Sequence, residues 1–369
     1  MKRFIFAIGA MLLLNICCFA DGPSDDIYQK FETDTIVENI PYQAKELVDQ
    51  IVSDRLTLDK LTNVSPIKIK EIFKEKVIEH FTSYKTQLIS IMIAVILSAA
   101  LSTVGGEGSH TAVFDLVCIL MITALLIEPI LICIQHSCET VKELSRFMLL
   151  YIPIYATVMI SSGSAGTAAV YHTSLMAAAQ IIGQLSGRVF LPLMQGYMLI
   201  SLSGTIGGNK GIKSAASAVK KTVNWGLAAA ATAFTGILSI QSFISSAADS
   251  AASKTVKFIA GSFVPIIGGA FSDALSAIQG SIRLIKASVG GAGIVITVLT
   301  FMPILIRITV LRAVLWSAKL SGDILSADKC SDILSCFLNI LSALTALLLT
   351  VMMVFIISTA VMINTVSNL

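Results

Sequence analysis

The feature that most constrains this chain is a series of apolar blocks of about 17 to 28 residues. A helix of about 20 apolar residues crosses the hydrocarbon core of a bilayer, because each residue adds about 1.5 Å. Long runs such as 88–104 lack the alternation of polar and apolar positions that membrane-barrel strands show. With 55 % hydrophobic and 13 % charged residues, the chain is too apolar for a surface that faces only water. We therefore predict an all-α fold, a polytopic bundle of transmembrane helices.

The predicted membrane spans follow these apolar blocks, the fourth of them carrying a weak signal. They are 86–104, 111–134, 147–166, 168–184, 188–206, 223–243, 291–311 and 334–362. This path places the basic loops around Lys213 and Lys319 together in the cytoplasm, as the positive-inside rule prefers. It leaves segments 135–146 and 244–290 outside.

The first 85 residues predict a leader followed by a charged segment. Lys2 and Arg3 precede an apolar run that ends at Ala20, which is typical of a secretory signal peptide cleaved after Ala20. An uncleaved first helix is the alternative. Segment 21–85 mixes charges of both signs with spaced apolar residues, which predicts extracytoplasmic helix. The stretch that Pro66 opens suits a helix lying on the membrane or on a partner, or equally one packed on its own chain.

The predicted organisation has five parts. A signal peptide (1–20) precedes the charged segment (21–85), a first group of transmembrane helices (86–243), an amphipathic or re-entrant hairpin (244–290) and the C-terminal transmembrane helices (291–369). Small residues crowd the middle of the chain, as in Gly183-x-x-x-Gly187 and Gly290-Gly-Ala-Gly293. Such residues let membrane helices approach closely, so we expect a tightly packed bundle or a homo-oligomer.

Residue patterns that carry chemistry are missing from the sequence. The four histidines are scattered without metal spacing, and no serine sits in a nucleophile-elbow setting. The stretch Gly204-Thr-Ile-Gly-Gly-Asn-Lys-Gly departs from the phosphate-binding loop at Asn209 and Gly211, so we reject a nucleotide site. A bridge between Cys133 and Cys138 is conceivable, although ordinary membrane thiols are favoured. We predict no catalytic residue, metal or cofactor, and a net charge of +3 gives no reason to expect nucleic acid.

Four charged residues fall at membrane depth, where each costs roughly 2.5 to 3.5 kcal/mol on insertion scales. Asp115 and Arg188 lie near span ends and can reach the interface by snorkelling. Glu128 and Arg307 lie deeper. They either pair across the bundle or line a polar path, as a transporter would need.

Segment 225–289 is the most informative part of the chain. Apolar residues from Phe271 to Val289 recur at i, i+3, i+4 and i+7, which predicts an amphipathic helix. Pro265 and the following glycines break the chain before it, which suits an interfacial or re-entrant hairpin and equally a surface hairpin that only packs. If this helix is a partner surface, Ile278→Asp should stop assembly but not membrane insertion. The candidate assembly positions here are Asp249, Lys254, Pro265, Gly268, Gly269, Asp273 and Ile278.

Two blocks of this segment resemble one protein family. The run Lys-Phe-x-x-Gly-Ser-Phe-Val-Pro-x-x-Gly-Gly-x-x-Ser-Asp-Ala at 257–274 and the block 225–241 are similar to the stage III sporulation protein AE family. The resemblance implies a multi-pass component of the channel complex between mother cell and forespore, placed in the mother-cell-derived membrane around the forespore after engulfment. It also implies a need for late forespore gene expression, with other subunits of the complex as partners. It carries over no catalytic residue.

The alternatives to this function are a transporter and a membrane enzyme. A stand-alone transporter or permease of a small solute could use Glu128 and Arg307, yet no internal repeat relates 86–206 to 223–362. A membrane enzyme would need a polar cluster inside the spans, and the sequence contains no such cluster.

Overall fold

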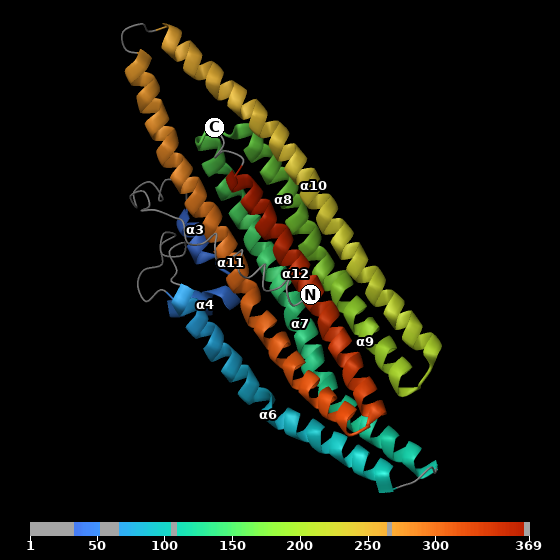
Figure 1. Ribbon diagram of the computed structural model, residues 1–369. Helices are drawn as coiled ribbons and strands as arrows, with labels where there is room; N and C mark the ends of the chain where they lie inside the picture. The colour runs from blue at the N-terminus through green and yellow to red at the C-terminus, as the bar shows by residue number, and fades with distance from the viewer. Residues whose placement is uncertain (1–32, 52–65, 105–108, 264–267, 365–369) are drawn as a thin grey trace.

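The computed structural model describes residues 33–51, 66–104, 109–263 and 268–364. This part of the chain is helical throughout apart from short turns, and six of its helical rods are long and apolar enough to cross a membrane. The rods lie side by side in an elongated bundle, with α10 along one outer edge and α6 along the opposite one (Figure 1). The prediction of an all-α bundle is confirmed. The predicted signal peptide and Pro265 lie outside the described residues.

The elements carry these bounds. In chain order they are α3 (Thr33–Glu38), α4 (Tyr42–Ile51), α6 (Pro66–Val104), α7 (Ser109–Ser161), α8 (Ala165–Leu185), the π-helical turn η1 (Ser186–Phe190), α9 (Leu191–Ile206), α10 (Lys210–Phe263), α11 (Gly268–Ile324) and α12 (Asp328–Asn364). The longest, α7, α10 and α11, have 53, 54 and 57 residues. Each is therefore about 80 Å long, whereas the hydrocarbon core is about 30 Å thick. A bilayer can enclose only part of each rod.

The predicted separation of spans 111–134 and 147–166 is wrong, because residues 135–146 are helical and join the two spans into α7. Its charged residues recur at helical spacing, so Glu139, Lys142 and Arg146 are exposed on one side of the rod. The hydroxyl of Ser145 donates a hydrogen bond to the carbonyl of Val141, so this polar group has its partner within the helix. A polar stretch can therefore continue a helix without a turn.

The spans predicted at 168–184 and 188–206 also form one rod. The helices α8 and α9 are joined through η1, whose C-terminal neighbour Leu191 donates its N–H to the Ser186 carbonyl. A π-helical turn inserts extra backbone without reversing the chain. This fusion and the one in α7 reduce eight predicted spans to six rods.

The charged segment before the first span is continuous with it. Pro66 begins α6, where its missing N–H costs nothing, and the helix runs on to Val104. Lys76 of α6 forms ion pairs with Glu46 of α4 at 3.0 Å and with Glu79 at 3.1 Å. The helix therefore packs partly on its own chain, which was one of the two predicted readings.

The predicted amphipathic helix 271–289 is part of α11 and continues directly into the next predicted span. The glycines at 290–293 do not end the helix. The end of α10 and the start of α11 lie near each other at one far tip of the bundle (Figure 1). A re-entrant arrangement of this hairpin stays a prediction.

A stack of aromatic rings lies in the centre of the bundle. Phe147, Tyr151 and Tyr155 follow one another on α7 with ring centroids 5.6 Å apart at each step, and Tyr155 meets Tyr171 of α8 edge-on at 5.1 Å. All three tyrosines are fully buried. Such stacks add about 0.5 to 1.5 kcal/mol per pair beyond the burial of their area.

Glycines of α11 make room for this stack. The Tyr151 hydroxyl donates to the Val289 carbonyl at 3.0 Å. A Cβ added to Gly293 would overlap the Tyr151 ring, and one added to Gly290 would come within 2.9 Å of the Tyr155 hydroxyl oxygen. The expected close packing at Gly290–Gly293 is thus realised by inserted tyrosines.

Candidate functional site

The strongest candidate for a binding site is a groove between α9, α10 and α12. It lies at the end of the bundle where α9 turns into α10 and α11 turns into α12 (Figure 1). Its volume is about 260 Å³. The lining is mostly polar and consists of Tyr197, Ser201, Thr205, Lys213, Ala216, Ser217, Lys220, Asp332, Ser335, Cys336 and Asn339.

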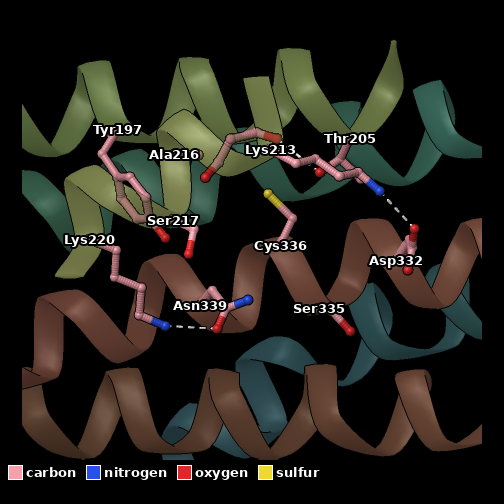
Figure 2. A pocket seen from close by; sticks show the side chains of 11 residues that line it. Tyr197, Thr205, Lys213, Ala216, Ser217, Lys220, Asp332, Ser335, Cys336 and Asn339 are labelled. Carbon is pink, nitrogen blue, oxygen red and sulfur yellow. Dashed lines mark hydrogen bonds and ion pairs between the residues drawn. The ribbon is translucent and has the colours of Figure 1, made fainter. Parts of the chain in front are cut away.

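Two lysines of α10 bridge the groove to α12, as Figure 2 shows. The Lys213 ammonium lies 2.9 Å from the Asp332 carboxylate, and the Lys220 ammonium donates to the Asn339 side-chain oxygen at 2.8 Å. Cys336 lies between these contacts. The contact of Lys213 with Asp332 also shows that the two predicted basic loops lie at the same end of the bundle.

A tight helical hairpin positions the α10 side of the groove. Gly204 lets α9 and α10 pack closely against each other, since a Cβ at this position would lie 2.8 Å from the Lys213 backbone nitrogen. Gly208 has a φ of +65°, which favours glycine. The Asn209 side chain then accepts from the Gly211 N–H at 2.9 Å and caps α10. The glycine-rich stretch rejected as a nucleotide loop is therefore a turn with a helix cap.

This groove is not among the predicted sites, although the sequence contains its signal. Lys213 and Lys220 are seven residues apart, and α12 carries Asp332, Ser335, Cys336 and Asn339 at i, i+3, i+4 and i+7. Both spacings place the residues on one helix face. A polar stripe at the start of an apolar span was the pattern to look for.

Asp249, a predicted assembly position, holds α10 against the first turn of α8. Its carboxylate accepts the Gly166 N–H at 2.7 Å, the Thr167 N–H at 2.8 Å and the Thr167 hydroxyl at 2.8 Å. The first N–H groups of a helix have no partner within that helix and lie at its positive end. The contact is within one chain, and a role in assembly stays a prediction.

The two predicted intramembrane charges do not pair with each other. Arg307 donates its Nε–H to the Tyr84 hydroxyl at 3.0 Å and so links α11 to α6. Glu128 is exposed on α7. Within the part of the chain that the structure describes, no ion pair joins Glu128 to Arg307.

The remaining predicted positions are spread along the tip of the α10–α11 hairpin. Lys254 is exposed near the end of α10, and Gly268 and Gly269 begin α11. Asp273 and Ile278 lie in α11. Cys133 and Cys138 are free, buried thiols, so the conceivable bridge between them is not formed.

Helical rods of this length and apolarity, packed through buried tyrosines and small residues, define a multi-pass helical membrane protein. The family model described as Stage III sporulation protein AE matches residues 42–366, so the chain belongs to the stage III sporulation protein AE family. The family resemblance found in the sequence is thereby confirmed. The chain is a sporulation-family membrane protein.

A curated relative supports the same family. It is named Stage III sporulation protein AE, comes from Bacillus subtilis (strain 168), and is 27 % identical over 167 residues. The aligned part is 45 % of this chain and 42 % of the relative, so the match spans less than half of the relative's own length. No solved structure matches the chain.

Proposed function

We propose that this chain is a non-enzymatic membrane subunit of the sporulation channel complex that links mother cell and forespore. In this role it is needed for late forespore gene expression and for spore formation. The observation that carries the proposal is the family match over residues 42–366, which includes all six long apolar rods.

The shape of the bundle supports a role within a larger assembly. The most apolar part of α10 has only 11 % of its residues buried within the chain. An outer helix of this kind faces lipid or neighbouring subunits. Rods of about 80 Å also extend well beyond a hydrocarbon core of about 30 Å, which leaves helical surface outside the bilayer for other subunits.

The proposed location is the mother-cell-derived membrane around the forespore. A membrane subunit of a complex between the two compartments has to lie in one of their facing membranes. The predicted leader would direct the chain into the mother cell's membrane if the gene is expressed there.

The transporter alternative gains no support from the positions of Glu128 and Arg307. It relied on a polar path built from Glu128 and Arg307 near the bilayer midplane. In the structure Arg307 donates a hydrogen bond to Tyr84, and Glu128 is exposed on α7. We therefore put forward a single function.

The test is a gene deletion in the sporulating host, followed by microscopy with a late forespore reporter. The proposal predicts engulfed forespores that stop before the reporter is expressed. Wild-type protein carrying an epitope tag should restore expression and form a ring around the forespore. Normal spores in the deletion strain, or a functional tagged protein that stays in the outer cell membrane, would contradict the proposal.

A further inference from the structure

We propose that the groove between α9, α10 and α12 binds a phosphate group, carried by an anionic phospholipid or by a soluble phosphate. The site is argued from the residues around the groove and does not depend on the sporulation role. It is called the basic groove below, with the lining residues given above.

Positive charge exceeds negative charge in the basic groove. Lys213 and Lys220 enter from α10, and Arg312 of α11 lies near enough to Lys220 to interact electrostatically. Among the lining residues Asp332 is the one carboxylate. Within the lining, two lysines face one carboxylate, which leaves one positive charge in excess and attracts an anion.

The lysines keep hydrogen-bond donors for a further partner. An ammonium has three N–H donors, and the described contacts use one at Lys213 and one at Lys220. The partner of Lys220 is a neutral amide oxygen, so its charge is not balanced there. Serine hydroxyls at 217 and 335 line the same groove. Ammonium and hydroxyl groups are the side-chain donors that phosphate oxygens accept from.

The residues around the basic groove are those typical of the membrane depth where headgroups are found. Both tryptophans of the chain are at this end of the bundle, with Trp225 75 % exposed and Trp316 60 % exposed. Trp225 lies four residues after Lys221, at the point where α10 becomes apolar. Exposed tryptophans beside lysines are typical of the membrane–water interface. A lipid phosphate would therefore be at the right height to enter.

The size of the groove suits a small charged group. Pockets for drug-sized ligands have volumes of about 300 to 1,000 Å³. At about 260 Å³ the basic groove is smaller, and its polar lining is unsuited to an acyl chain. Only the phosphate group would enter, and a lipid's acyl chains would remain outside among the other lipids.

The test uses the full-length protein purified in a neutral detergent. Its thermal unfolding temperature is measured against added phosphatidylglycerol, phosphatidylcholine and inorganic phosphate. We expect phosphatidylglycerol or inorganic phosphate to raise the unfolding temperature in a saturable way, and phosphatidylcholine to have little effect. A response to phosphatidylglycerol alone identifies a lipid phosphate, and a response to inorganic phosphate identifies a soluble one. No response to either would overturn the proposal.

Two variants distinguish binding at a specific site from non-specific attraction between opposite charges. Lys220→Gln should weaken binding about fivefold, the effect of removing one lysine near an anionic surface. Lys221→Gln removes the same charge from an exposed neighbour outside the lining, so binding should change less than about twofold. Equal weakening by both variants would overturn the proposal. If Lys220→Gln does not fold, Asn339→Asp tests the same point, because its new carboxylate should compete for Lys220.

Discussion

The helices α10 and α11 have similar lengths and both contain long apolar stretches, yet the protein uses them in opposite ways. In their most apolar windows, 67 % of α11 and 61 % of α12 are buried, against 11 % of α10. In water an apolar helix must bury that surface, but in a bilayer lipid tails cover it equally well. Apolarity in this chain therefore predicts insertion into a membrane and says little about packing.

The glycines show what does determine packing. Gly290 and Gly293 of α11 lie directly against Tyr155 and Tyr151, where a Cβ would overlap. Gly236 of α10 would have open space around an added Cβ. Membrane helices associate through close contacts and hydrogen bonds, so the tyrosine stack marks the structural core and α10 marks its periphery. Substitutions in the two regions should differ accordingly.

The largest difference is expected between Tyr151→Ala and Phe243→Ala. The first removes a fully buried ring and its hydrogen bond to Val289, so we expect the free energy of unfolding to fall by about 3 kcal/mol. The second removes a ring that is 76 % exposed on α10, so a change within about 0.5 kcal/mol is expected. Reversible unfolding in mixed detergent micelles measures both. Similar losses would remove the distinction between core and periphery.

A smaller contrast is expected between Gly293→Ala and Gly236→Ala. The added methyl group at Gly293 must displace the Tyr151 ring, which should cost about 1 to 3 kcal/mol. At Gly236 the methyl group meets nothing and should instead favour the helix by up to about 1 kcal/mol. Unfolding temperatures of the two variants should thus shift in opposite directions. A stable Gly293→Ala protein would show that the core is more loosely packed than described.

Asp249 ties peripheral α10 to the first turn of α8. Asp249→Ala leaves the first N–H groups of α8 without their cap. We expect the free energy of unfolding to fall by about 1 to 2 kcal/mol. Amide hydrogen exchange at Gly166 and Thr167 should become faster. Lys254→Ala, an exposed change on the same helix, is the control and should leave that exchange unaltered. Unchanged protection in Asp249→Ala would show that the cap is not needed.

The smallest effect is expected at Glu128. Its side chain is exposed on α7 and takes part in none of the described ion pairs, so Glu128→Gln should change stability by less than about 0.5 kcal/mol. Spore yield should also stay normal. Normal protein level with complete loss of spores would return the transporter function to consideration.

Much of the fold could be predicted from the sequence, because long apolar runs have few structural solutions. The helices, their order and the basic end of the bundle all followed from that pattern. The continuity of α7 could not be read in the same way, because the charged residues at 139–146 interrupt the apolar run between two predicted spans. Their helical spacing was the overlooked signal, since polar residues on one face interrupt apolarity without interrupting the helix.

The candidate site was less predictable, because it depends on which helices become neighbours. Lys220 and Asn339 are 119 residues apart, and only the packing of α10 on α12 brings them together. Likewise Arg307 meets Tyr84 from 223 residues away, where the sequence had suggested Glu128. Charge and depth identify the residues that need a partner, but they do not identify the partner.

The most direct test of the central claim, that this chain works as a membrane subunit, is its native mass in sporulating cells. Tagged protein is extracted in mild detergent from sporulating cells and from vegetative cells that express the same gene, and both extracts are compared on native gels. We predict a large assembly in the sporulating sample and a smaller species in the vegetative one. A species of the same small mass in both samples, with normal spore formation, would contradict the account.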